Sequence, residues 1–122
     1  MKLKWIGAYE LNKSNIDGYV PNVAGIYRIS VKQNDDSLKV VYVGQTEDLV
    51  DRMSQYLNKD TDNDCLLNHL NKHYCYFKVA EVVYQRDRDA GEKALFEHFG
   101  PNLCNDPDKI PNVEPADINF EN

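Results

Sequence analysis

The sequence predicts a single α+β domain in which helices flank a small three-stranded antiparallel sheet. Two runs rich in β-branched and aromatic residues, GIYRISV and KVVYVG, flank the polar segment QNDDS, a pattern typical of a β-hairpin. A third run of this kind covers residues 74–84. Segments with helical periodicity follow the hairpin and the third run, and 122 residues suffice to bury one core.

The hairpin is expected to bring two tyrosines together. With the turn centred on the Asn-Asp pair, Tyr27 lies directly opposite Tyr42, and Ile29 lies opposite Val40. Because side chains alternate across a strand, both phenols then share one face, with β-carbons about 5 Å apart. A register slip of two residues would keep both phenols on that face.

Helical periodicity appears in separate segments after the hairpin. Thr46 is a candidate N-cap for the first helix, because its hydroxyl can accept a hydrogen bond from the first turn. A Gly-Pro pair is expected to end the last helix. The expected helices are one with the buried stripe Leu49, Met53 and Leu57, one over residues 65–72, and one over residues 87–99.

The predicted domain covers residues 1–105, with its core in residues 25–105. Residues 1–24 are expected to be a lead-in, with a short strand near residues 3–6 followed by polar turns. Residues 106–122 are acidic and contain several prolines, so they are expected to form an extended tail.

The formal net charge of −6 counts against a large basic surface of the kind that binds nucleic acid. The tail has five acidic residues and one lysine, so it accounts for −4 and leaves −2 for the rest of the chain. The predicted domain itself is therefore nearly neutral.

One hypothesis for the acidic tail is that it lies across the basic parts of a cleft as a phosphate mimic.

No apolar run approaches the length of a membrane span, and no secretory signal is evident, so no membrane partner is expected. Three cysteines in such a chain predict free thiols in a reducing compartment, and a cytoplasmic location is the expectation.

Five motifs in order carry a resemblance to a known family. They are Gly25-Ile26-Tyr27, Tyr42-Val43-Gly44, the helical segment that ends in Arg52, then Glu92, and finally the segment PNLCN. In this order and spacing they resemble the GIY-YIG nuclease domain over roughly residues 25–105. The resemblance implies a metal-dependent endonuclease that hydrolyses phosphodiester bonds of DNA, with Mg²⁺ or Mn²⁺ as its cofactor.

The resemblance also implies a role for each motif residue. Tyr27 matches the general base, Tyr42 and Tyr56 support it, Arg52 contacts the scissile phosphate, and Glu92 holds the metal ion. Many family members carry His where this chain has Tyr56, so a base that depends on that His is not expected here. Without the resemblance, the favoured interpretation of the two hairpin tyrosines is a hydrophobic pair that stabilises the hairpin.

Helical spacing gives an independent reason to consider Glu92. It precedes the core residues Leu95, Phe96 and Phe99 by three, four and seven positions, so it lies on or beside the buried face. A buried carboxylate needs a partner or a metal ion. The alternative to a metal ion is contact with water or an ion pair with Arg88.

Three further residues have open interpretations. Arg52 either binds phosphate or is a solvated residue paired with a neighbouring aspartate. Gly44 either allows a sharp turn from strand into helix or lets substrate approach. Asn105 matches the closing Asn of the family, where it either supports the last loop or contacts phosphate.

Two alternatives belong to other classes of function. Cys65, His69, His73 and Cys75 are zinc-type ligands near one helix, although paired Cys-x-x-Cys spacing is missing. The chain is alternatively a catalytically weak or inactive GIY-YIG module that binds nucleic acid or a protein partner. For either function, a protein partner or a homodimer is expected to be able to supply target specificity.

Overall fold

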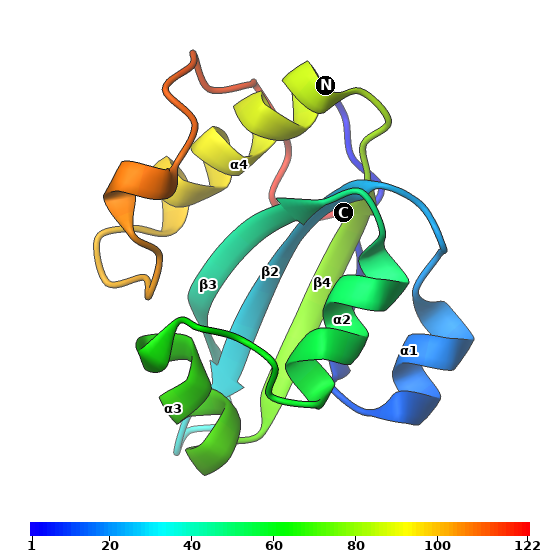
Figure 1. Cartoon of the computed structure of the whole chain (residues 1–122), viewed down its shortest axis with the longest axis vertical. Helices are drawn as coiled ribbons and strands as arrows, with labels where there is room; N and C mark the ends of the chain where they lie inside the picture. Colours follow the sequence, from blue (N-terminus) through cyan, green and yellow to red (C-terminus); the bar gives the residue numbers. More distant parts are fainter.

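The computed structural model describes residues 1–122 and contains one antiparallel sheet with the strand order β1-β4-β2-β3. The strands are β1 (Ile6–Glu10), β2 (Gly25–Lys32), β3 (Leu38–Thr46) and β4 (Cys75–Glu81). The helices are α1 (Lys13–Tyr19), α2 (Leu49–Leu57), α3 (Asp64–Lys72) and α4 (Gln85–Phe99), with a 3₁₀ turn at Pro107–Lys109 (Figure 1).

The predicted α+β class is confirmed, but the predicted number of three strands is wrong. The fourth strand, β1, lies at residues 6–10 and pairs with β4. Helix α1 occupies part of the lead-in that was predicted to be polar turns. Asn12 caps this helix by accepting a hydrogen bond from the backbone of Asn15. Only Ile16 is buried, so α1 has no apolar periodicity that a sequence pattern would reveal.

The hairpin register at the tyrosines differs from the prediction by two residues, one from the position of the turn and one from an additional residue in β3. Tyr27 pairs with Gly44, Ile29 pairs with Tyr42, and Val40 pairs with the residue after Ile29. A bulge follows Ile29, where two residues of one strand oppose one of the other. The two phenols still share a face, as expected for a shift of two residues, and their ring centroids are 6.5 Å apart.

Helix α2 begins slightly later than predicted. Thr46 is the last residue of β3, and the N-cap of α2 is Asp48, whose side chain accepts a hydrogen bond from the backbone of Asp51. The buried residues of α2 are Leu49, Met53 and Tyr56.

The sheet separates two apolar clusters. Helices α1, α2 and α3 cover one face, which carries the Tyr27 side chain, while α4 covers the opposite face (Figure 1). The second cluster also contains both ends of the chain, through Leu3, Trp5 and Ile118.

The tail is tied to the rest of the domain by specific polar contacts. The side-chain amide of Asn119 accepts a hydrogen bond from the backbone N–H of Leu3 at 2.6 Å and donates one to its carbonyl at 2.9 Å. The buried guanidinium of Arg28 donates to the carbonyl of Phe120 and forms an ion pair with Glu121. These contacts connect the last residues to the sheet face that packs against α4.

Two of the three cysteines are not free thiols, contrary to the prediction. Cys65, at the start of α3, forms a disulfide with Cys104, in the loop after α4. Only Cys75 is free, and it is buried. None of the helices has both the length and the apolar character needed to span a lipid bilayer.

Candidate active site at the edge of β3

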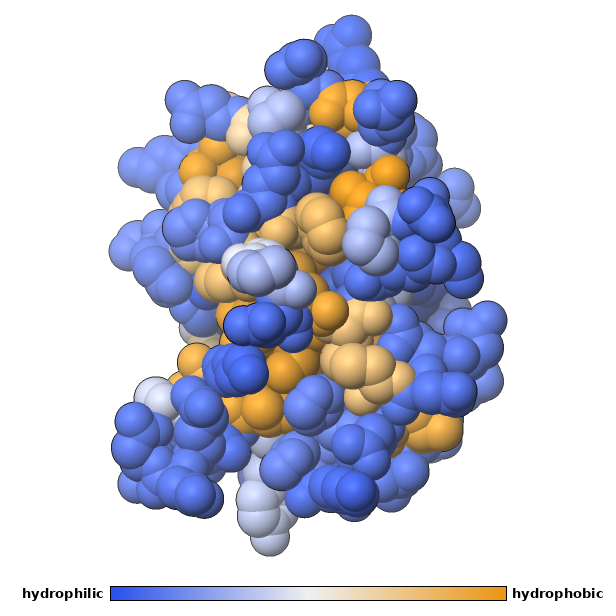
Figure 2. Space-filling view, turned by 90° about the vertical axis from the view of Figure 1, so that its left-hand side faces the viewer, coloured by the Kyte–Doolittle hydropathy of each residue, from blue (hydrophilic) through white to orange (hydrophobic).

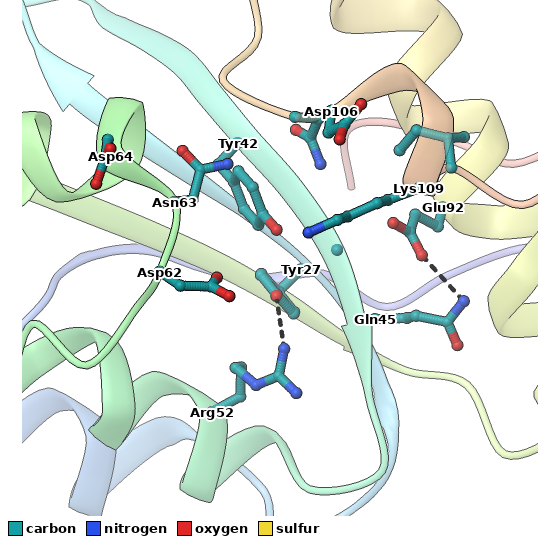
Figure 3. A pocket seen from close by; sticks show the side chains of 13 residues that line it. Tyr27, Tyr42, Gln45, Arg52, Asp62, Asn63, Asp64, Glu92, Asp106 and Lys109 are labelled. Carbon is teal, nitrogen blue, oxygen red and sulfur yellow. Dashed lines mark hydrogen bonds between the residues drawn. The ribbon is translucent and has the colours of Figure 1, made fainter.

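A cavity of about 420 Å³ lies beside β3, the strand at one edge of the sheet (Figure 3). We call it the β3 pocket. Six residues predicted from the sequence line it: Tyr27, Tyr42, Gly44, Arg52, Glu92 and Asn105. Its other lining residues are Gln45, Asp62, Asn63, Asp64, Asp106, Lys109 and Ile110. The surface on this side of the molecule is mainly hydrophilic, with hydrophobic residues gathered near its centre (Figure 2).

The remaining predicted residue, Tyr56, does not line the pocket but contacts Tyr27, which does. The hydroxyl groups of Tyr56 and Tyr27 are 2.5 Å apart, and both side chains are buried. Nη1 of Arg52 donates a longer hydrogen bond of 3.4 Å to the Tyr27 hydroxyl. The Tyr42 ring lies beside both phenols, with centroids 6.5 Å from Tyr27 and 6.2 Å from Tyr56. The structure therefore brings the three tyrosines and the arginine together.

Both pocket tyrosines are neutral phenols at physiological pH. Burial raises the pKa of Tyr27 well above its ordinary value of 10.0, and the adjacent Tyr56 raises it further. The Arg52 guanidinium lowers the pKa of Tyr27, but by less than burial raises it. Burial is also the main cause of the raised pKa of Tyr42. Tyr27 is therefore a hydrogen-bonding phenol, and not a phenolate, in the protein without substrate.

Gly44 makes room for the Tyr27 ring. A β-carbon built at position 44 would lie 2.3 Å from the Tyr27 hydroxyl oxygen, far inside van der Waals contact. The predicted sharp turn at this glycine is wrong, because β3 continues through Gly44 to Thr46. The absence of a side chain at this cross-strand position lets the phenol reach across β3 to the pocket.

Asn105 acts as a partner for the edge of β3. Its side chain accepts a hydrogen bond from the backbone N–H of Val43 at 3.0 Å and donates one to the carbonyl of Val43 at 2.7 Å. Cys104, the preceding residue, donates its backbone N–H to the carbonyl of Val41. Of the two predicted roles for Asn105, these contacts favour support of the loop, because both ends of the amide are engaged by backbone.

Arg52 does not form the ion pair with Asp48 or Asp51 that would make it an ordinary surface residue. Its hydrogen bond goes to Tyr27, and its buried Nε has no hydrogen-bond partner. The other terminal nitrogen, Nη2, forms no hydrogen bond within the protein, so the guanidinium keeps a donor available at the pocket, as an anion-binding residue would.

Glu92 is only 9% exposed, and it extends from α4 towards the pocket. Gln45 Nε2 donates a 2.9 Å hydrogen bond to one carboxylate oxygen, and the other oxygen has no protein donor. Burial raises the pKa of Glu92, while the Gln45 hydrogen bond lowers it. The predicted alternative partner, Arg88, instead donates to the carbonyls of Val82 and Val83. Because one oxygen of this cavity-lining carboxylate has no hydrogen-bond donor, Glu92 can serve as one ligand of Mg²⁺ or Mn²⁺.

Lys109 lines the pocket but is not among the site residues predicted from the sequence. Its side chain crosses the cavity, with the amine directed towards the side where Tyr42 and Tyr27 lie (Figure 3). It forms no ion pair within 4.0 Å. No sequence signal identifies it, because it comes from the tail, where acidic residues dominate. Gln45 was also missed, although it directly follows the YVG motif.

Acidic groups outnumber basic groups around the pocket. This balance suits a cation better than an unaccompanied phosphate. The acidic residues are Asp62, Asp64, Glu92 and Asp106, and the basic residues are Arg52 and Lys109.

The alternative zinc set predicted from the sequence is not assembled. Cys75, the first residue of β4, is buried in the core, and Cys65 is bonded to Cys104. The residues that do meet are Cys65, His69 and Cys104.

Comparison of the chain with protein-family models, with curated proteins and with solved structures gives no significant match. The resemblance to the GIY-YIG nuclease domain therefore rests on the motif residues alone.

We predict that Gly44→Ala destabilises the protein by about 1–3 kcal/mol, because the new methyl group must displace the Tyr27 ring. The matched control is Gly18→Ala in α1, where a β-carbon meets no atom within 4 Å. Urea unfolding of both variants measures the difference. Equal stability of the two variants would show that Tyr27 does not lie over Gly44.

We also predict that the free energy of unfolding falls as the pH rises above about 10. The raised pKa values of Tyr27 and Tyr42 mean that the folded protein keeps phenolic protons which the unfolded chain has already released. This contribution is fully present below the unfolded pKa and is lost as the pH rises through the folded pKa. Urea midpoints between about pH 8 and pH 11 measure the effect. The decline should be shallower in Tyr42→Phe, and an identical decline in that variant would contradict the assignment.

Proposed function

We propose that this protein is a metal-dependent endonuclease of the GIY-YIG type, which hydrolyses phosphodiester bonds of DNA. The observation that carries the proposal is the convergence of residues from β2, β3, α2 and α4 on the β3 pocket. Tyrosines, a guanidinium and a sheltered carboxylate are the groups that the motif resemblance assigns to phosphodiester cleavage.

In this proposal Arg52 and Lys109 bind the phosphate from different segments of the chain. Arg52 offers a rigid fork of donors, and Lys109 offers a mobile point charge. Both are needed because the remaining charged groups of the pocket repel an anion.

Tyr27 is the proposed base that takes a proton from the attacking water. Since its phenol is protonated in the free protein, it must first release its own proton to solvent. The adjacent Arg52 favours the phenolate, and so would any cation held by Glu92. Tyr42 and Tyr56 fix the orientation of the Tyr27 ring.

Glu92 is the proposed ligand of Mg²⁺ or Mn²⁺. The ion, when bound, polarises the phosphate and stabilises the leaving oxygen. The chain's own contribution is to orient the carboxylate, because Gln45 holds one of its oxygens and leaves the other free.

The second candidate function is binding of nucleic acid or a protein partner without efficient cleavage. The acidic balance of the pocket and the neutral state of Tyr27 favour this candidate. A homodimer or a partner protein that supplies target specificity fits either function.

We predict that the protein nicks supercoiled plasmid DNA with Mg²⁺ or Mn²⁺, and that Glu92→Gln slows nicking by about 100-fold or more. The matched control is Glu97→Gln, an exposed position on the same helix, which should retain the wild-type rate. Cleavage by Glu92→Gln at the wild-type rate would contradict the role of Glu92. If the wild-type protein binds DNA but does not nick it, the second candidate function is favoured.

We predict that Lys109→Ala weakens DNA binding several-fold and lowers the slope of log affinity against log salt by about 1. Removing one phosphate contact has this effect because fewer counterions are released on binding. Binding is measured by fluorescence anisotropy in Ca²⁺, so that cleavage does not interfere. Lys72→Ala, at an exposed position on α3, is the matched control. Identical affinity and slope in the two variants would exclude Lys109 from the phosphate site.

A further inference from the structure

A cluster of soft ligands lies outside the residues used in the proposed reaction. Cys65 and His69 are one turn apart on α3, and Cys104 comes from the loop after α4. One potential ligand atom from each of the three side chains lies within 4.8 Å of the other two. The two sulfur atoms are joined as a disulfide in this structure, with α-carbons 5.4 Å apart.

We propose that Cys65, His69 and Cys104 bind Zn²⁺ when this disulfide is reduced. Zinc prefers thiolate sulfur and imidazole nitrogen in tetrahedral geometry, and three protein ligands leave one position for water. Two helical residues four positions apart and one residue from a facing loop can surround a single ion. Both Cys65 and the loop are accessible from solvent, so a reductant and a metal ion can reach them.

The environment of His69 supports this site. Its Nδ1 is buried and has no hydrogen-bond partner. This orphaned nitrogen leaves the imidazole without a protein partner on one side of its ring, and imidazole is a common zinc ligand.

The redox step needs a reductant as co-reactant, and a dithiol can supply it. Thiol–disulfide exchange breaks the Cys65–Cys104 bond and gives two thiols, while the reductant is oxidised to its own disulfide. Binding of Zn²⁺ then releases the two thiol protons to solvent. Thiol–disulfide exchange with a disulfide oxidant, which is itself reduced to its dithiol, reforms the Cys65–Cys104 bond and releases the ion.

The disulfide and the bound zinc ion would each join the start of α3 to the loop after α4. The pocket residues Asp62, Asn63 and Asp64 directly precede Cys65, and Asn105 directly follows Cys104. Disulfide and zinc therefore each hold one wall of the β3 pocket in place. The consequence for activity rests on the proposed function, whereas zinc binding does not.

The test is a titration of the fully reduced protein with Co²⁺, in the presence of a phosphine reductant and without oxygen. Cobalt in place of zinc reports thiolate ligation by a sulfur-to-metal charge-transfer band and tetrahedral geometry by its visible bands. We expect both signals to saturate at one equivalent and to disappear when Zn²⁺ is added. The oxidised protein should show neither signal.

Variants separate this cluster from the other cysteine and from adventitious binding. His69→Gln and Cys104→Ser should each weaken Co²⁺ binding by more than about tenfold, because a three-ligand site loses one ligand. Cys75→Ala should bind as the wild type does. His69→Gln keeps both cysteines, so its folding can be verified in the oxidised form before reduction. Absence of the signals in reduced wild type, or wild-type affinity in His69→Gln, would overturn the proposal. Plasmid nicking plays no part in this measurement, so its outcome is independent of the nuclease assignment.

Discussion

The position of the Tyr27 ring over Gly44 is the constraint on which the β3 pocket depends. The ring crosses β3 only because its cross-strand partner has no side chain. Buried in this place, the Tyr27 hydroxyl meets Tyr56 from α2 and receives a hydrogen bond from Arg52, one turn earlier on that helix. A single close approach between two strands therefore fixes the register near the pocket and the orientation of α2 against the sheet.

The pocket also depends on its location at a sheet edge. Tyr27 and Tyr42 lie on the face that packs against α2, whereas Glu92 comes from α4 on the opposite face. Groups from opposite faces can meet only where the sheet ends, and β3 is an edge strand. Gln45 links the two sides, because it belongs to β3 and donates to Glu92. Asn105 occupies the backbone groups of Val43 that would otherwise be free at this edge.

The sequence predicted the elements that depend on local pattern and missed those that depend on distant contacts. The hairpin, α3, α4 and the sheltered position of Glu92 follow from alternation and helical periodicity, which are local properties. The direct pairing of Tyr27 with Tyr42 was wrong by two residues, because the position of the turn shifts the register by one residue and the bulge in β3 adds a second residue without a sequence signal. The Cys65–Cys104 bond and the place of Lys109 in the pocket depend on how the last loop returns to the sheet, which no local pattern specifies.

The charges of the pocket impose an order on the proposed reaction. Four carboxylates face two cations, so the lining has a formal charge of −2 before anything binds. A phosphate that arrives alone meets net repulsion, and Tyr27 then stays protonated in its buried position. A divalent cation at Glu92 would offset this charge, and it would also lower the cost of ionising the phenol. In the proposed enzyme, Glu92 would therefore hold its cation before the phosphate binds or together with it, and the acidic lining would favour a cation over a lone anion.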